Sequence, residues 1–170
     1  MALAFCILAH RNPAQVGRLL RALAHPGNAV FLHYEKRAPR AEHAAIERLA
    51  GETPHVRLLP ARAILWGRFS VVAAQLEGMR RALEAREREP WSHFITLSGQ
   101  DFPLLPQARM TEELEAAGDR SFMSFFDPLE QPLWKNLDDR LERFYFDSPL
   151  LEKVLRLPFA GRRLRGMFGW

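Results

Sequence analysis

The residues of this sequence that could do chemistry stand where short apolar runs end. His10 and Arg11 follow the first run, Glu35 closes the second, and Asp101 follows a later run within the stretch LSGQD. If these runs are parallel strands, their carboxyl ends lie along one edge of a sheet, where open α/β sheets bind ligands. The pattern therefore indicates a ligand crevice, although His10 could also be a structural hydrogen-bonding residue and Glu35 could lie in a solvated loop.

The same polar segments lack the signatures of several well-known sites. Ser98 stands next to Gly99, but LSGQD is not the G-x-S-x-G turn that carries the nucleophile of serine hydrolases. The first turn, HRNPAQVG, has neither the glycine fingerprint of a dinucleotide-binding domain nor a P-loop. The sequence has no D-x-D pair, and its six histidines do not have metal-binding spacing, so we expect no catalytic metal.

Two further residues stand out by their type. Trp66 precedes Gly67 in a loop just before a predicted helix, where it could stack on a base or sugar or simply cover the edge of the sheet. Cys6, the single cysteine, lies in the apolar run LAFCIL, which favours a core residue over a nucleophile. One cysteine also excludes an intrachain disulfide and a zinc site built from several cysteines.

Size and composition indicate a folded domain rather than a disordered chain. The chain has 170 residues, of which 48% are hydrophobic and 26% charged, as is ordinary for a globular domain. No apolar run approaches the ~18 residues that a membrane-spanning helix needs. The net charge of +4 is concentrated in Leu151–Trp170, a basic tail that is either solvated or able to contact phosphate, nucleic acid or an anionic lipid surface.

Apolar runs alternate with amphipathic segments along the chain. The runs of strand length are Leu3–His10, Ala29–Glu35, His55–Pro60, His93–Gly99 and Ser121–Phe126. Segments with helical periodicity lie between them, at residues 12–23, 39–49, 70–86 and 110–118. Alternation of this kind predicts an α/β fold, in which a mostly parallel, Rossmann-like sheet carries helices on both faces.

Residues at the ends of these segments predict where the helices begin and end. Asn12 can cap the first helix, with Pro13 at its first position, and Ser70 and Thr111 can cap the third and fourth. Gly118 is a typical helix stop. The apolar face of the third helix is expected to comprise its large residues, Val72, Leu76, Met79 and Leu83.

Three segments, taken in order, resemble one enzyme family. They are FCILAHRNPAQVGRLLRALAHPGNAVFLHYEKR, AILWGRFSVVAAQL and FITLSGQDFPL. Together they are similar to the core-2/I-branching β-1,6-N-acetylglucosaminyltransferases and the peptide O-xylosyltransferases, over about residues 4–126. The resemblance implies a GT-A-like fold. It also implies an enzyme that transfers a sugar of the N-acetylglucosamine or xylose type from a UDP-sugar to a hydroxyl of a glycan or protein, with inversion and without a metal or other cofactor.

The resemblance also assigns residues to the donor site. Glu35, where the family more often has an aspartate, would face the uridine, and Asp101 would lie near the sugar end of the site. Gly99 would let the backbone approach the ligand closely, with His10 and Ser98 in supporting positions. The residues expected against the nucleotide, its base and its ribose are Leu8, Ile64, Leu65 and Trp66.

The resemblance divides the chain into two parts. Residues 1–126 correspond to the nucleotide-sugar-binding α/β domain, and residues 127–170 to the start of an acceptor-side part that carries the basic tail and is incomplete, as if truncated at the C-terminus. The family's catalytic base and diphosphate-binding basic residues are then expected beyond Trp170. The acidic residues of NLDDRLERF could supply a base or form an exposed helix face. A shortened fold should expose apolar surface and self-associate.

Two other functions stay open. The chain could be a nucleotide-sugar- or glycan-binding module without catalysis, or a polyanion-binding protein that uses the basic tail. Nucleic-acid binding by the domain itself is not expected, because the sequence has no basic face with interleaved aromatic residues and no nucleic-acid-binding motif. Arginine outnumbers lysine 21 to 3, and the apolar start lacks a signal-peptide pattern. These features favour a GC-rich bacterial source and a cytoplasmic protein, with peripheral membrane association as an alternative.

Overall fold

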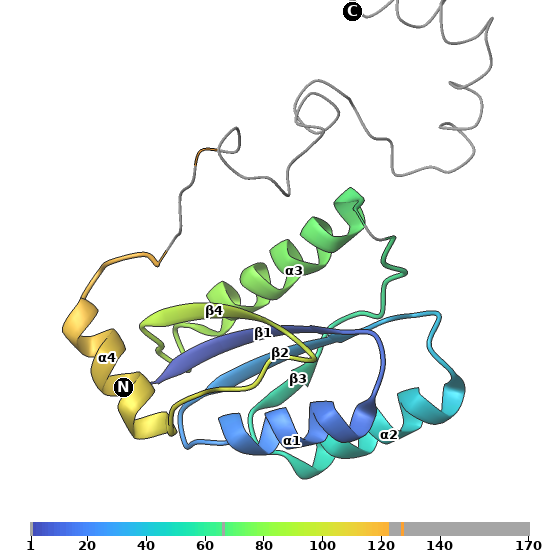
Figure 1. Cartoon of the computed structure of the whole chain (residues 1–170), viewed down its shortest axis with the longest axis horizontal. Coiled ribbons are helices and arrows are strands. Elements are labelled where there is room, and N and C mark those ends of the chain that lie inside the picture. Colours follow the sequence, from blue (N-terminus) through green and yellow to red (C-terminus); the bar gives the residue numbers. More distant parts are fainter. Residues whose placement is uncertain (1, 66, 123–126, 128–170) are drawn as a thin grey trace, which may run out of the picture. The chain divides into compact units, whose positions relative to one another are not determined.

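A parallel sheet organises the part of the chain that the structure describes (Figure 1). The structure is a computed structural model, and it describes residues 2–65, 67–122 and 127. Within these residues the strands are β1 (Leu3–Ala9), β2 (Ala29–Tyr34), β3 (Val56–Leu58) and β4 (His93–Ser98). The helices are α1 (Pro13–Leu23), α2 (Arg40–Glu52), α3 (Phe69–Ala85) and α4 (Gln107–Ala117). All of these elements lie in one compact unit, Met1–Asp119.

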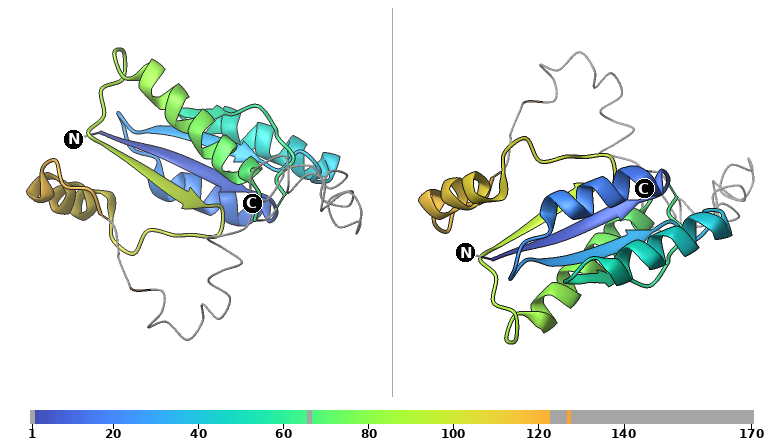
Figure 2. Two further views of the ribbon diagram at one scale, coloured as in Figure 1. Left: turned by 90° about the horizontal axis from the view of Figure 1, so that it is seen from above. Right: turned by 90° about the horizontal axis from the view of Figure 1, so that it is seen from below.

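The strand order is β3-β2-β1-β4, and every pair of neighbours is parallel. The chain adds β2 and β3 on one side of β1 and then, after α3, places β4 on the other side, as the two views of Figure 2 show. The order therefore reverses between β1 and β4. In doubly wound sheets such a reversal opens a crevice at the carboxyl ends of the strands. The predicted α/β class, a parallel sheet with helices on both faces, is confirmed.

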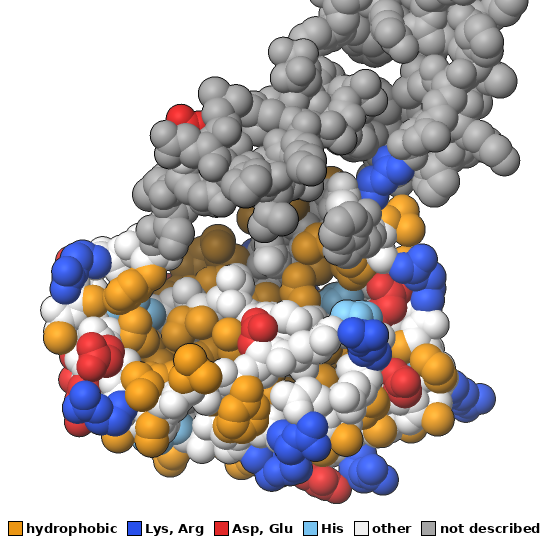
Figure 3. All heavy atoms as spheres, viewed as in Figure 1, with side chains coloured by type: hydrophobic (Ala, Val, Ile, Leu, Met, Phe, Trp, Pro, Cys, Tyr) orange, Lys and Arg blue, Asp and Glu red, His pale blue; other side chains and the backbone are white. Residues whose placement is uncertain are grey.

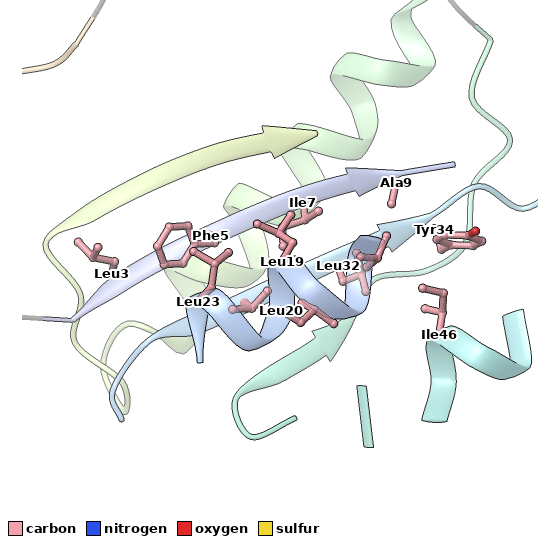
Figure 4. Packing of buried hydrophobic residues seen from close by; sticks show 12 residues of the cluster. Leu3, Phe5, Ile7, Ala9, Leu19, Leu20, Leu23, Leu32, Tyr34 and Ile46 are labelled. Carbon is pink, nitrogen blue, oxygen red and sulfur yellow. The ribbon is translucent and has the colours of Figure 1, made fainter. Parts of the chain in front are cut away.

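Large apolar side chains fill the space between the sheet and the helices α1 and α2. Alternate residues of β1 face this side, and they pack against helix residues that recur at helical spacing. Figure 4 shows Leu19, Leu20 and Leu23 of α1 close to Phe5 and Ile7 of β1. Each of these side chains is at most 1% exposed. This side of the sheet therefore holds the larger apolar cluster of the described residues.

Helix α1 begins as the sequence predicted. Asn12 adopts a left-handed backbone conformation (φ 58°), which asparagine tolerates better than most residues. Its side-chain oxygen accepts a hydrogen bond from the Gln15 N–H at 3.2 Å. Pro13 follows at the start of the helix, where a missing N–H leaves no partner unsatisfied. Both the cap and the proline position are confirmed.

Helix α3 covers the opposite side of the sheet with small residues. Its buried residues are Ser70, Ala74, Gly78 and Ala82, which repeat every four positions and so share one side of the helix. The predicted apolar face is wrong, because its residues are 42–52% exposed: Val72, Leu76, Met79 and Leu83. The reason is the close packing that small residues permit, since a Cβ on Gly78 would lie 2.3 Å from Cys6 Sγ of β1. Cys6 itself is buried, as predicted.

The predicted cap of α3 is also wrong. The helix begins one residue before Ser70, and Arg68 holds the cap position, where its side chain does not cap the helix. Ser70 lies buried in the first turn. Its hydroxyl accepts a hydrogen bond from the Leu65 N–H at 2.9 Å and lies 3.3 Å from the Leu65 carbonyl oxygen, to which it donates. The serine therefore fixes the loop before the helix instead of capping the helix.

Helix α4 starts earlier than the sequence predicted. Its first residue is Gln107, directly after Pro106, so Thr111 lies inside the helix and the predicted cap is wrong. A proline before a helix fixes its own φ near the helical value, which the periodicity of the segment does not reveal. Gly118 ends the helix as predicted, with φ 61°, a value that residues with a side chain rarely adopt.

Some predictions concern residues outside those that the structure describes. The predicted strand Ser121–Phe126 starts with two described residues that have no strand structure, and residues 123–126 are not described. Trp66, the segment NLDDRLERF and the basic tail Leu151–Trp170 also lie outside the described residues. Among the helices of the described residues, none has both the length and the apolar character needed to cross a membrane.

Candidate functional site

A cavity of about 660 Å³ lies at the carboxyl ends of β1, β2 and β4, beside the point where the strand order reverses. Sites for small molecules and cofactors typically have volumes of about 300–1,000 Å³. The lining comes from the ends of these strands, from the loop between β3 and α3, and from the first turns of α3. This is the edge of the sheet at which the sequence predicted a ligand crevice.

The floor of the cavity is a row of side chains across neighbouring strands. Leu8 of β1 stands beside His33 of β2 and beside Ser98 of β4 in the register of the sheet, and all of them line the cavity. Thr96 lines it two residues before Ser98. Because side chains on a strand alternate between faces, these residues share the side of the sheet on which Cys6 meets α3.

One wall of the cavity belongs to α3. Val71 and Gln75 line the cavity, and they lie one turn apart near the start of the helix. Further along the helix, the close contact between Gly78 and Cys6 leaves no room between helix and sheet. The space on this side is therefore open near the strand ends and closed behind them.

A second wall is the loop between β3 and α3, which is fastened to the end of β2. The Arg62 N–H donates a hydrogen bond to His33 Nε2 at 3.1 Å. The Lys36 N–H donates to the Arg62 carbonyl at 3.3 Å. Because His33 is 1% exposed, its burial lowers the pKa of the imidazole, and the ring is neutral at neutral pH. A neutral ring can accept the Arg62 hydrogen bond.

Glu35 holds the same loop at Ile64, two residues after Arg62. Its Oε1 accepts hydrogen bonds from the Arg37 backbone N–H at 3.0 Å and from Arg37 Nε at 2.9 Å, and its Oε2 accepts from the Ile64 N–H at 2.9 Å. Arg37 Nη2 in turn donates to the Ile64 carbonyl at 2.5 Å. Burial raises the pKa of Glu35, but the hydrogen bonds from Arg37 and Ile64 outweigh it and hold the pKa below its usual value. The charged carboxylate keeps one lone pair on Oε2 for a ligand.

The structure brings together most of the predicted site residues. Those that line the cavity are Leu8, His10, Glu35, Ile64 and Ser98. Leu65 neighbours Ile64 in the loop but does not line the cavity, and Trp66 lies outside the described residues. Gly99 and Asp101 do not line it either. The ligand contacts of all these residues stay predictions.

Asp101 and Gly99 have local contacts at the end of β4. Asp101 Oδ2 accepts a hydrogen bond from the Ser98 N–H at 2.7 Å, and the Asp101 N–H donates to the Ser98 carbonyl at 3.0 Å. Gly99 donates its N–H to the Leu8 carbonyl at 2.9 Å, and a Cβ on it would lie 2.5 Å from Ala9 Cβ. The close approach that Gly99 permits is therefore to β1, whereas the prediction from the sequence was an approach to the ligand.

Several lining residues were missed by the sequence analysis. They are Ala9, His33, Arg37, Val71, Gln75, Thr96 and Leu97. Strand alternation could have found His33 and Thr96, because each precedes a predicted site residue by two positions and so shares its side of the sheet. No comparable signal exists for Val71 and Gln75, because their place depends on how α3 sits on the sheet.

Charged side chains of both signs lie on the face of the molecule that Figure 3 shows. Lys, Arg, Asp and Glu side chains alternate around the margin of the face in Figure 3, with hydrophobic side chains between them. In the cavity, Glu35 is paired with Arg37. No group of three or more His, Cys, Asp or Glu among the described residues could hold a metal ion. The remaining polar groups that line the cavity are hydroxyl, amide and imidazole groups, which suit the polar edges of an uncharged ring or sugar.

Comparisons with known proteins point to one family of enzymes. The model of the Core-2/I-Branching enzyme family matches residues 3–154. Xylosyltransferase 1 of Canis lupus familiaris is 30% identical over 123 residues, which are 71% of this chain and 13% of that protein. Xylosyltransferase 2 of Homo sapiens is also 30% identical, over 71% of this chain and 14% of its own length. A β-1,3-galactosyl-O-glycosyl-glycoprotein β-1,6-N-acetylglucosaminyltransferase 4 of Danio rerio is 28% identical over 66% of this chain and 26% of its own length.

The family match covers every helix and strand of the described residues. The chain spans 13–15% of the length of the xylosyltransferase 1 sequences that it matches. The resemblance seen in the three sequence segments is confirmed, and this chain belongs to the Core-2/I-Branching enzyme family of glycosyltransferases.

Proposed function

We propose that the cavity at the ends of β1, β2 and β4 binds the nucleotide of a UDP-sugar, and that the protein is an inverting glycosyltransferase. The observation that carries the proposal is the position of this cavity, beside the reversal of strand order in a chain of a glycosyltransferase family. The names of the relatives support a donor that carries xylose or N-acetylglucosamine. The acceptor is then a hydroxyl of a glycan or a protein.

The lining supports a uracil ring and its ribose as the bound part. Leu8, Ile64 and Val71 offer apolar contacts for the faces of a planar ring. Glu35 offers the free lone pair of Oε2 to an N–H or hydroxyl of the ligand. Ser98 adds a hydroxyl to the floor of the cavity. A few polar groups around an apolar surface fix the orientation of a ligand and give specificity.

Sugar transfer needs two further roles besides nucleotide binding. A general base must take the proton of the acceptor hydroxyl, and positive charge must stabilise the leaving diphosphate. In this proposal the described unit contributes the donor site, and both roles belong to other parts of the protein. The proposal is for a metal-independent enzyme, because the family resemblance implies basic side chains at the diphosphate in place of a metal.

The proposal is tested by calorimetric titration of the 170-residue chain with UDP, UDP-N-acetylglucosamine and UDP-xylose. Each titration is run once with EDTA and once with Mn²⁺, and ADP is the control nucleotide. We expect saturable binding of the uridine nucleotides with equal affinity in EDTA and Mn²⁺, and much weaker binding of ADP. Trp66→Ala should weaken binding, because the resemblance places Trp66 against the base.

Three outcomes separate the proposal from its alternatives. Absence of UDP binding by a folded chain would contradict it. Binding that requires Mn²⁺ would contradict metal independence alone. In an assay on protein that includes the parts with these two roles, binding without release of UDP from a UDP-sugar in the presence of glycan acceptors would favour a nucleotide-sugar-binding module over a complete transferase.

A further inference from the structure

We propose that His33 reads the base of the bound nucleotide, by donating a hydrogen bond from its Nδ1–H to a carbonyl oxygen of the uracil ring. The inference rests on the proposed function, because it names a ligand contact within the same cavity. It gives a role in specificity to a residue that its sequence context did not single out. Three features of His33 support this contact: the ring nitrogen that carries the proton, the missing partner of that nitrogen, and the surroundings of the ring.

The contact with the loop decides the protonation of the ring. The Arg62 N–H donates to His33 Nε2 at 3.1 Å, so Nε2 must be the unprotonated nitrogen that accepts. A neutral imidazole has one donor and one acceptor nitrogen. The proton of neutral His33 is therefore on Nδ1, and the burial of the ring keeps it in this neutral form.

This Nδ1–H has no hydrogen-bond partner among the described residues. Buried polar groups almost always have one, because an unpaired buried donor loses its hydrogen bonds to water without replacement. His33 nonetheless lines the cavity. The Nδ1 atom is itself buried. A ligand oxygen that enters the cavity and displaces the atoms that cover Nδ1 would supply the missing partner.

A neutral carbonyl oxygen fits this position better than a phosphate oxygen. Leu8 stands beside His33 in the sheet, and Ile64 and Val71 line the same cavity, so a ligand bound there meets apolar side chains as well as the carboxylate of Glu35. Among the described residues that line the cavity, Arg37 is the only Lys or Arg, and it is paired with Glu35, so a phosphate placed there would be desolvated without a free cation. A uracil ring has apolar faces and carbonyl oxygens at its edge, which matches both features.

Two substitutions separate the proposed donor from the contact with the loop. The side-chain oxygen in His33→Gln can replace Nε2 as the acceptor for the Arg62 N–H, but this variant has no N–H at the place of Nδ1. The amide in His33→Asn can put an N–H near the place of Nδ1, but it does not reach Arg62. We expect His33→Gln to weaken UDP binding about tenfold, the scale of one buried hydrogen bond. His33→Asn should weaken UDP binding less and lower the thermal stability more.

Base analogues test the same contact from the ligand side. In 2-thio-UDP and 4-thio-UDP one carbonyl oxygen is replaced by sulfur, a weaker acceptor. The wild-type chain should bind one of the two analogues about tenfold more weakly than UDP. His33→Gln should bind that analogue and UDP with equal affinity, because the sulfur in the ligand and the substitution in the protein remove the same hydrogen bond. A merely structural role of His33 would leave the ratio of analogue to UDP affinity the same in both proteins.

The outcomes distinguish this inference from the proposed function. If the wild-type chain does not bind UDP, the proposed function fails. If it binds UDP and both thio analogues equally well, the inference about His33 fails and the donor site stands, without any variant being needed. Unchanged UDP affinity in a folded His33→Gln chain would overturn the inference as well.

Discussion

The helices on the two sides of the sheet pack against it in opposite ways. On one side, α1 places Leu19, Leu20 and Leu23 against large residues of β1, and these side chains are fully buried. On the other side, α3 turns small residues toward the sheet and leaves most of its large apolar residues 42% or more exposed. Both helices are amphipathic in sequence, but only α1 uses its large residues for the core.

The difference teaches how the fold makes room for a ligand. A helix that packs through Ala74, Gly78 and Ala82 lies close to the sheet behind the site, where Gly78 meets Cys6. Toward the carboxyl ends of the strands, the same side of the sheet carries His33, Thr96 and Ser98, which line the cavity. The side with large residues supplies stability, and the side with small residues supplies the site.

The largest effect is expected from one substitution made on each side of the sheet. Leu20→Ala in α1 should lower the free energy of unfolding by about 2–5 kcal/mol, because it removes a buried side chain and leaves a cavity. Leu76→Ala in α3 should change it by no more than about 0.5 kcal/mol, because Leu76 is exposed. Urea unfolding followed by circular dichroism measures both values. Equal costs would mean that another surface covers α3 in solution and that the two sides do not differ.

A smaller effect is expected where α3 meets the sheet. Gly78→Ala should destabilise the protein by about 1–3 kcal/mol through overpacking, because its Cβ would lie 2.3 Å from Cys6 Sγ. Gly51→Ala in α2 is the matched control, since its Cβ would meet nothing within 4 Å, and it should stabilise by up to about 1 kcal/mol.

A double variant checks the cause of the Gly78 effect. Adding Cys6→Ala to Gly78→Ala should recover part of the lost stability, because the two side chains contact each other and their effects are not additive. The same urea titration measures it. Purely additive losses would show that Cys6 is not the obstacle.

A moderate effect on binding is expected from the loop contact of Arg37. Arg37→Met removes the hydrogen bonds to Glu35 and to the Ile64 carbonyl, so the wall of the cavity should lose its fixed position. We expect the Kd for UDP to rise about fivefold, as for one hydrogen bond. Arg109→Met is the control, because Arg109 is similarly exposed and ion-paired, but on α4. A similar rise of the Kd in both variants would mean that the loss of a positive charge weakens UDP binding, and not the loss of the loop contact.

The smallest effect is expected in the pH dependence of stability. The pKa of folded His33 is below its ordinary value of 6.5, so the unfolded chain binds more protons in mild acid and stability falls as the pH drops below about 6.5. The pKa of folded Glu35 is below its ordinary value of 4.5, so its contribution is lost only at lower pH, as the pH falls through the folded pKa. Urea unfolding between pH 7.5 and pH 3 should show both losses, with His33→Gln removing the first and Glu35→Gln the second. If a variant still lost stability over the pH range assigned to the residue that it replaces, that assignment would be contradicted.

The fold was largely predictable because its strands are marked by local patterns. The apolar runs gave the strands of the described unit to within a few residues, and Asn12, Pro13 and Gly118 marked helix ends correctly. The buried face of α3 was not predictable from hydrophobic periodicity. Periodicity follows the large apolar residues of a helix and takes no account of the residues of the sheet against which the helix packs. Gly78 is buried since Cys6 lies across from it, and that contact is a property of the tertiary structure.

The site was predictable in its location and only partly in its residues. Parallel strands bring their ends together, so Leu8, Glu35 and Ser98 could be placed at one edge before the structure was known. The hydrogen bonds of Glu35 with Arg37 and Ile64 could not, because they depend on the path of the loop between β3 and α3. The same holds for Asp101, whose carboxylate bonds the Ser98 N–H.

The most direct test of a donor site on the α3 side of the sheet is a titration of UDP into a cavity-filling variant. Thr96→Trp puts a large side chain into the cavity, and Leu104→Trp adds the same side chain at a residue that is 98% exposed and does not line the cavity. We predict that Leu104→Trp binds UDP like the wild type and that folded Thr96→Trp shows no saturable binding. Wild-type affinity in folded Thr96→Trp would place the nucleotide elsewhere and contradict the assignment of this cavity.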